Sequence, residues 1–371
     1  MLDKKVVFLT YLPSPYRVDF FNELNKFCNL HVIYYEDQSS NFGWKNSKIN
    51  HEYKKTVLSE KSFLIGIYTL AKLLLKNRKN IIIIGGYAMF PEIFSIFILK
   101  LLNVKFVLNS DGGFITPGKF KTWFKKVLIK SATYWLSSGK NTTKTLEYYG
   151  AKNNNIYEYY FTSLFEKDIL KKIPSKDEKK FLKNKKHLNT EKSYIIFVGQ
   201  LIHRKGLDIL IKAFAKTNLT FVDVLIIGDG ELKEELNKLC KTENVSSKVK
   251  FLGKKNKSDV LDYLKLSDVF ILPSREDIWG LVVNEAVSCG LVVISTKEVG
   301  ASHSLIIDNE NGYIINANKI DELSKTIKKT YNKDLILQQQ KSLNISKAYT
   351  IENMVKSHLN LFKRYYANSR N

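Results

Sequence analysis

The sequence predicts an α/β protein with two doubly wound domains, each built on a mainly parallel sheet. Short runs of β-branched and apolar residues alternate with segments of helical period, which is typical of βαβ units. A charged stretch after Asp168 interrupts this alternation, which then restarts. The length of 371 residues also exceeds what one hydrophobic core usually serves and fits two domains of ordinary size.

The first domain is expected to span residues 1–172. Its predicted strands are 4–10, 30–35, 80–86 and 104–110, and its predicted helices are 16–27 and 91–102. The apolar stretch 81–102 superficially resembles a membrane span. Because Pro91, Glu92 and Lys100 interrupt it, a strand followed by a buried helix explains it better.

The second domain is expected to span residues 173–345. The charged stretch 171–193 is interpreted as an interdomain linker that carries one exposed helix. The predicted strands are 193–200, 223–230, 249–253, 269–274 and 291–296, and the predicted helices are 206–216, 231–240 and 280–289. A last helix, about 346–371, is expected to pack back on the first domain. Ligands are expected where the carboxyl ends of the strands of the two domains face each other.

Charge and cysteine content restrict the partners. With 59 Lys and Arg against 36 Asp and Glu, the net charge of +23 favours nucleic acid, acidic lipid or a phosphorylated ligand. No helix-turn-helix, RRM or zinc-finger pattern is present and the basic residues are dispersed, so nucleic acid is not expected. The three cysteines lack a C-x-x-C pairing, and the chain start resembles no signal peptide, which indicates a reduced cytosolic setting without structural zinc.

The segment 274–290 combines Asp277, Gly280 and Glu285. A glycine at the start of a helix lets an anion approach backbone N–H groups that have no partner inside the helix, which makes a phosphate site. Carboxylates beside such a site suit the hydroxyls of a ribose and a second sugar, so the predicted ligand is a sugar joined to a nucleotide through a diphosphate. Alternatively, Glu285 is a solvated helix residue and Asp277 only complements the helix dipole.

The segment 197–214 places Arg204 and Lys205 in a loop between a strand and a helix, with Gly199 and Gly206 on either side. Cations in such a loop are what a diphosphate leaving group requires. Lys205 is the best candidate for neutralising charge on the leaving phosphate, and Arg204 can assist. The alternative is a pair of exposed loop cations.

Five segments in this order resemble the family-4 retaining glycosyltransferases of the GT-B fold: 197–214, 226–232, 251–274, 275–296 and 298–315. In the first half, "LPSPYRVDFFNEL", "LNSDGGFI" and "YEYYFTSLF" resemble a branch that builds bacterial surface polysaccharides. The resemblance implies two Rossmann-like domains facing a cleft, and an enzyme of the hexosyltransferase type. It implies transfer of a sugar, with retention, from a nucleotide sugar to a glycan acceptor, lipid-linked, in capsule, O-antigen or lipopolysaccharide synthesis. The expected location is the cytoplasm, on the inner face of the cell membrane.

By this resemblance, Glu285 holds the ribose hydroxyls and Asp277 contacts the donor sugar, although Glu is usual where Asp277 stands. Gln200 replaces a common arginine and can hydrogen-bond a phosphate without neutralising it, which places more of that task on Lys205 and Arg204. No cofactor or metal is expected, since the phosphate site has cations and the six His residues form no ligand cluster. The full donor-binding prediction is Gly199, Gln200, Arg204, Lys205, Gly228, Gly230, Lys254, Asp277, Trp279, Gly280, Leu281 and Glu285.

The predicted catalytic residues are Lys205, Asp277 and Asp111. Asp111 can accept a proton or hydrogen bond from the acceptor hydroxyl, or it is a turn residue before two glycines. Tyr16 and Arg17 are the acceptor candidates. Arg17 either meets an acceptor phosphate or caps a helix start.

The segment 118–144 holds seven lysines and no acid, and its apolar residues follow a helical face. Such a helix can lie in an anionic bilayer interface through Lys121, Trp123, Phe124, Lys125 and Lys126. Alternatively, it packs on the first sheet with its lysines in solvent. Three rival functions share parts of this pattern: a nucleotide-sugar epimerase of the same fold, a basic nucleic-acid-binding protein and a non-catalytic scaffold.

Overall fold

The computed structural model describes residues 2–37, 50–60, 62–116 and 118–367. The chain divides into two compact units, an N-terminal unit of residues 1–163 and 350–371 and a C-terminal unit of residues 164–349. The sequence placed the first boundary at 172/173, nine residues later along the chain, and the second at 345/346. Both units are parallel-sheet α/β domains, so the predicted fold class is confirmed.

The N-terminal unit is built on a parallel sheet with the strand order β3-β2-β1-β4-β5-β6-β7. Its strands are β1 (Leu2–Thr10), β2 (Cys28–Tyr34), β3 (Lys54–Val57), β4 (Ile81–Ile84), β5 (Val107–Ser110), β6 (Tyr134–Ser137) and β7 (Ile156–Glu158). Its helices are α1 (Pro15–Asn25), α2 (Phe63–Lys76), α3 (Phe90–Leu101), α4 (Lys119–Lys130), α5 (Lys140–Tyr148) and α14 (Ile351–Ala367), with a 3-10 turn at Asn153–Asn155.

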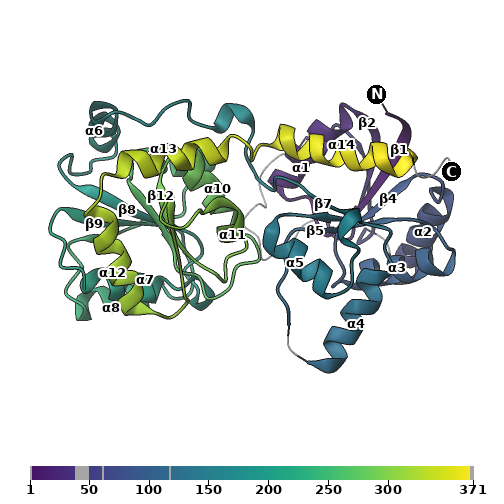
Figure 1. Cartoon of the computed structure of the whole chain (residues 1–371), viewed down its shortest axis with the longest axis horizontal. Helices are drawn as coiled ribbons and strands as arrows, with labels where there is room; N and C mark the ends of the chain where they lie inside the picture. The colour runs from purple at the N-terminus through teal and green to yellow at the C-terminus, as the bar shows by residue number, and fades with distance from the viewer. Residues whose placement is uncertain (1, 38–49, 61, 117, 368–371) are drawn as a thin grey trace. The chain divides into compact units, whose positions relative to one another are not determined.

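Side chains that alternate along β1 divide the core of this unit between two faces. Val7 and Leu9 belong to the apolar cluster that α2, α3, α4 and α5 cover. Phe8 points the other way, and its ring lies 5.0 Å from that of Phe21 on α1. Helix α14, whose bounds fall inside the predicted helix 346–371, packs against α1 on this second face (Figure 1).

The C-terminal unit has a parallel sheet with the strand order β10-β9-β8-β11-β12-β13. Its strands are β8 (Ser193–Val198), β9 (Val222–Ile227), β10 (Val249–Gly253), β11 (Val269–Leu272), β12 (Val292–Thr296) and β13 (Gly312–Ile315). Its helices are α6 (Lys176–Lys185), α7 (Leu207–Ala215), α8 (Lys233–Thr242), α9 (Lys257–Leu266), α10 (Leu281–Ser288), α11 (Ser302–Leu305), α12 (Ile320–Tyr331) and α13 (Leu335–Ser346), with 3-10 turns at Glu166–Asp168 and His203–Lys205.

The strand order of the C-terminal sheet reverses between β8 and β11. The chain builds outward from β8 through β9 to β10, then returns to the other side of β8 and continues through β11 to β13. The loops that leave β8 and β11 therefore start side by side, but the first leads to one side of the sheet and the second to the other. In doubly wound sheets such a reversal, at the carboxyl ends of the strands, is the usual ligand site.

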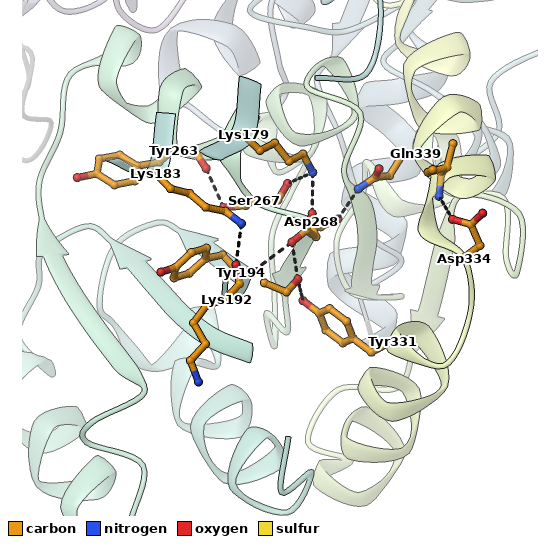
Figure 2. Close-up of polar contacts among 12 residues, drawn as sticks. Lys179, Lys183, Lys192, Tyr194, Tyr263, Ser267, Asp268, Tyr331, Asp334 and Gln339 are labelled. Carbon is orange, nitrogen blue, oxygen red and sulfur yellow. Dashed lines mark hydrogen bonds and ion pairs between the residues drawn. The ribbon is translucent and has the colours of Figure 1, made fainter. Parts of the chain in front are cut away.

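The interpretation of residues 171–193 as a linker is wrong, because α6 packs into the C-terminal unit (Figure 2). Lys179 Nζ donates hydrogen bonds to Ser267 O at 3.0 Å and to Asp268 Oδ1 at 2.6 Å. Lys183 Nζ donates to Lys192 O at 2.7 Å. The long aliphatic stems of these lysines are buried while their ammonium groups are paired, so a helix that looks polar in sequence has a packed face.

Burial by itself would raise the pKa of Asp268, but the charge of Lys179 and its hydrogen bonds lower it overall. Asp268 also accepts hydrogen bonds from the Ser193 hydroxyl and the Tyr194 amide, and Ser193 is within 3.5 Å of the Tyr331 hydroxyl. This network attaches α6 to the starts of β8 and β11 (Figure 2). It lies at the amino ends of the strands, the edge opposite the expected ligand site.

Candidate active site

The loops that follow β8 and β11 are pressed together. The Arg275 amide donates a hydrogen bond to Arg204 O at 2.8 Å. Gly206 has φ +68°, and a Cβ there would lie 2.1 Å from Pro273 O. Only glycine therefore fits at this point of contact.

Lys205 and Asp277, which the sequence placed in different segments, form an ion pair across these two loops. Their side chains are 12% and 13% exposed. Gly280, with φ +88°, is the N-cap of α10, and a Cβ on it would lie 3.4 Å from Asp277 Oδ2. The ammonium of Lys205, the carboxylate of Asp277 and the start of α10 thus converge. No side chain caps α10 and its first turn contains no acid, so its amino end suits an anion.

A third loop holds the backbone of Asp277. The Asp277 amide donates to Glu298 O at 3.0 Å, and the Gly300 amide donates to Asp277 O at 3.1 Å. Trp279, a predicted donor contact, is buried, and its indole N–H donates to Asn284 Oδ1 at 2.8 Å. Its ring therefore holds the loop from inside the unit.

Arg275, to which the sequence assigned no role, ties the same loops together. Its guanidinium donates to both carboxylate oxygens of Asp208, at 2.9 and 2.7 Å, and to His203 O at 2.6 Å. Burial alone would raise the pKa of Asp208, but hydrogen bonds and charge from Arg275 lower it. The sequence signal that could have identified this contact is the position of a cation, Arg275, directly after the predicted strand 269–274.

Glu285 is half-buried on α10. Burial raises the pKa of Glu285 to about 7. The positive charge of Lys257 acts to lower this pKa, and the negative charge of Asp168 acts to raise it. Lys257 and Asp168 are themselves 3.5 Å apart. Glu285 therefore titrates near neutral pH, where it can either accept hydrogen bonds as a carboxylate or donate one as an acid.

The other predicted donor residues divide into two groups. Gly199, Gly228 and Gly230 bring backbones together, since a Cβ on Gly228 would lie 1.8 Å from Gly199 O and one on Gly230 would lie 2.5 Å from Leu201 O. Glycine is thus required by loop packing at Gly228 and Gly230, whether or not a ligand approaches, whereas a Cβ on Gly199 would meet only the Phe197 ring, at 3.3 Å. A second group remains accessible at the surface: Gln200, Arg204 and Lys254 are exposed and Leu281 is half-buried.

In the N-terminal unit, Arg17 and Asp111 form an ion pair with each other. Asp111 also accepts hydrogen bonds from Asn109 Nδ2 at 2.8 Å and from the Tyr159 hydroxyl at 2.7 Å. Burial would lower the pKa of Arg17, but the charge of Asp111 outweighs this and raises it. Arg17 is therefore already neutralised by Asp111.

A recess of about 10 Å³, roughly the space of one water molecule, lies beside this pair. Tyr16, Phe161 and His358 contribute to its wall. His358 comes from α14 and is fully buried, which lowers its pKa to about 4. Its Nδ1–H donates to Met354 O at 2.8 Å, and in the described part of the chain Nε2 has no hydrogen-bond partner. The recess is too small to hold a sugar.

The basic segment 118–144 is not a single helix: α4 ends at Lys130, and β6 and the start of α5 follow. Leu128 and Ile129 pack into the core, whereas Trp123 is 59% exposed. Lys125 and Lys126 fold back, with Nζ 5.4 Å from the ring centroid of Tyr149 and 5.5 Å from that of Tyr148. Of the other residues predicted to contact a membrane, Lys121 is exposed and Phe124 is half-buried. Among the described residues no helix is both long and apolar enough to cross a membrane.

Comparison with known sequences finds a family match for most of the C-terminal unit. Residues 178–348 match the family "Glycosyl transferases group 1". An uncharacterized glycosyltransferase of Haemophilus influenzae is 28% identical over 282 residues, which are 74% of each chain. One of Methanocaldococcus jannaschii is 31% identical over 153 residues, 41% of this chain and 42% of the relative. A lipopolysaccharide core biosynthesis glycosyltransferase of Rhizobium meliloti is 31% identical over 133 residues, 36% of this chain and 38% of the relative. The chain thus spans about two fifths of the length of two of these relatives.

Solved structures share the fold of the whole chain. A glycosyltransferase from Rickettsia africae superposes with a TM-score of 0.75 at 18% identity, covering 98% of this chain and 99% of that one. The Anabaena protein HepE in complex with UDP gives a TM-score of 0.77 at 16% identity, covering 97% and 100%. The fold is that of the GT-B glycosyltransferases, and the C-terminal unit carries the group 1 sequence pattern.

Proposed function

We propose that this protein is a group 1 glycosyltransferase of the GT-B fold, which moves a sugar from a nucleotide-diphosphate sugar to a glycan acceptor with retention at the anomeric carbon. The observation that carries the proposal is the convergence of Lys205, Asp277 and the start of α10 at the reversal of strand order. An ammonium group beside a helix amino terminus is the arrangement that a diphosphate needs. The UDP bound to the Anabaena neighbour supports a nucleotide donor.

Lys205 changes partner in this proposal. Without donor it is neutralised by Asp277; the arriving diphosphate competes for the ammonium and carries two negative charges to it. Asp277 is then available to accept hydrogen bonds from hydroxyls of the donor sugar. Charge that develops on the leaving phosphate is stabilised by Lys205 and by the amides of α10, with Arg204 assisting from the exposed side of the loop.

Glu285 is proposed to hold the ribose hydroxyls. Two hydroxyl donors stabilise the carboxylate form, so donor binding should lower its raised pKa. Because lysine, arginine and backbone amides supply the positive charge, we propose that the reaction requires no metal ion. Activity that persists in a chelating buffer is the expected result.

The acceptor is proposed to bind to the N-terminal unit near Tyr16, with the paired Arg17 and Asp111 as fixed polar groups beside it. We further propose that this acceptor is lipid-linked, that α4 contacts an anionic membrane and that the enzyme works on its cytoplasmic face in surface-polysaccharide synthesis. The exposed Trp123 and the basic character of α4 support this, as does the Rhizobium relative, named for lipopolysaccharide core biosynthesis.

The test is Lys205→Ala. Loss of a leaving-group contact should lower turnover about 100-fold or more. Lys238→Ala, which removes an exposed lysine from α8, is the matched control and should leave turnover unchanged. A Lys205→Ala enzyme with wild-type turnover would remove Lys205 from the mechanism.

The donor is found first, by thermal-shift screening against UDP, GDP and other nucleotide sugars. Sugar isomerisation in the presence of donor alone would indicate an epimerase in place of a transferase.

A further inference from the structure

The N-terminal unit carries an apolar surface that the sites described above do not use. We call it the α2–α3 face, and it consists of exposed residues on these two helices and at their ends. Its members are Phe63, Leu64, Ile65, Tyr68 and Leu75 from α2, and Met89, Phe90, Phe97, Leu101 and Leu102 from α3 and its flanks. Monomeric proteins rarely leave so many large apolar side chains together in water, and such patches mark interaction sites.

The two helices present these residues side by side. Helix α2 packs against α3, and the rings of Phe63 and Phe90 lie 5.6 Å apart. Leu64 and Leu101 are 78% and 83% exposed. Figure 1 shows α2 and α3 as neighbours on one side of the N-terminal sheet.

Both helices are apolar on their inner side as well. Leu70 and Leu74 of α2 and Ile96 and Leu99 of α3 fill the core of the unit. A helix that is apolar all round is normally buried on every side, within protein or in lipid. The outer side of this pair therefore has less polar cover than contact with water alone would favour, and its exposed charged side chains are Lys72, Lys76 and Lys100.

Cations predominate around the face, although Glu36 lines the pocket beside it and the exposed Glu60 lies just before α2. Residues 62–146 contain thirteen Lys and Arg but two acids, Glu92 and Asp111. Glu92 is buried and accepts the Ala88 and Met89 amides, and Asp111 is paired with Arg17. Neither acid offsets the cations at the surface, of which Lys72, Lys76, Lys79 and Lys100 lie on or directly after α2 and α3.

We propose that the α2–α3 face docks on the surface of an anionic lipid bilayer. Large apolar and aromatic side chains enter the interface, and the surrounding lysines bind the lipid headgroups. A second copy of this chain is a poorer occupant, because the same cations would meet across the interface and repel. The inference rests on the proposed lipid-linked acceptor, and it extends the proposed membrane contact from α4 to a wider surface.

A pocket of about 330 Å³ opens beside the face and supports a lipid as the occupant. Phe63, Met89 and Phe90 belong to both the face and the pocket lining. Tyr11 and Tyr35, directly after β1 and β2, also line the pocket. Its lining is mainly apolar, with Glu36 and Ser59 as polar members. It lies where the N-terminal strand order reverses between β1 and β4, the usual ligand position in such sheets. A hydrocarbon chain of a docked lipid suits a recess of this chemistry.

The experiment measures sedimentation of the full chain with vesicles, without donor or acceptor. One set of vesicles is phosphatidylcholine alone, and the other contains about one-third phosphatidylglycerol, which gives the surface negative charge. The test variant is Leu64→Gln with Phe97→Gln and Leu101→Gln. The matched control is Phe181→Gln with Ile336→Gln and Leu337→Gln, which changes three exposed apolar residues of the C-terminal unit.

We expect the wild type and the control to bind the anionic vesicles and the test variant to bind them at least about tenfold more weakly. Both variants should keep the wild-type melting temperature, because the changed side chains are exposed. Unchanged vesicle binding by the test variant would overturn the proposal. So would a wild-type self-association that the test variant abolishes while its vesicle binding persists. Because the readout needs no catalysis, a failed transferase assay and a failed docking assay are distinguishable.

Discussion

Arg275 and Asp208 form a two-point ion pair, with 2.9 Å between Nη1 and Oδ1 and 2.7 Å between Nη2 and Oδ2, that joins the loop after β11 to the first turn of α7. The same guanidinium donates to His203 O, two residues before Lys205. The position of Lys205 relative to Asp277 therefore depends on a contact that includes neither residue. Such support is what holds a polar site in one geometry.

Arg275→Lys should loosen the site while keeping the charge. A lysine cannot contact both oxygens of Asp208 and also reach His203 O, so we expect the free energy of unfolding of the C-terminal unit to fall by about 1–2 kcal/mol and turnover to fall with it. Chemical denaturation and initial rates measure both effects. Lys216→Ala, which breaks the exposed pair with Asp321, is the control and should change stability by less than about 0.5 kcal/mol. Equal effects of the two changes would argue against a special role for Arg275.

Asp277→Asn should separate nucleotide binding from transfer. Removing this carboxylate frees Lys205 and takes a negative charge away from the diphosphate, so the free nucleoside diphosphate should bind several-fold more tightly. Transfer should nevertheless slow by about tenfold or more, because a contact to the donor sugar is lost. Calorimetric titration and turnover test the two parts. Weaker binding of the nucleoside diphosphate by Asp277→Asn would show that the carboxylate does not oppose the phosphate.

Glu285 should make stability and nucleotide affinity depend on pH in opposite senses. Its pKa is raised to about 7 in the folded chain, so the stability that it contributes is fully present below its ordinary pKa and is lost as pH rises through 7. The free energy of unfolding should therefore decline over this range by about 1–3 kcal/mol more in the wild type than in Glu285→Gln. Nucleotide affinity should rise over the same range, because ribose hydroxyls favour the carboxylate. Parallel pH profiles for the two proteins would contradict both expectations.

Replacing Trp123, Lys125 and Lys126 together with alanine should weaken binding to phosphatidylglycerol vesicles by about tenfold or more, since an aromatic anchor and two cations leave the interface. The nucleotide-induced shift in melting temperature should stay unchanged, because these residues lie in the other unit. Vesicle sedimentation and thermal unfolding provide the readouts. If this variant sediments with vesicles as the wild type does, these three residues do not contribute to membrane docking.

The sequence predicted the βα order and the long buried strands because their apolar runs are continuous and bounded by turn residues. The helix opened by Gly280 and ended at Gly290 was also confirmed, because both positions have positive φ and glycine marks them in sequence. Strands β3, β6, β7 and β13 were not predicted. Helix α6 was misjudged because its packed face is made of lysine stems, which carry no apolar signal.

The sequence by itself determined which residues could bind a charged, hydroxylated ligand, because residue chemistry and strand-end spacing are local properties. The tertiary structure alone decided their partners. Lys205 meets Asp277, 72 residues away, because the strand order reverses between β8 and β11; Arg17 meets Asp111, 94 residues away, and is neutralised. It also decided that Trp279 is internal and that Glu285 is buried enough to titrate near neutrality. Pairing and desolvation depend on which strands become neighbours, and no local pattern encodes that.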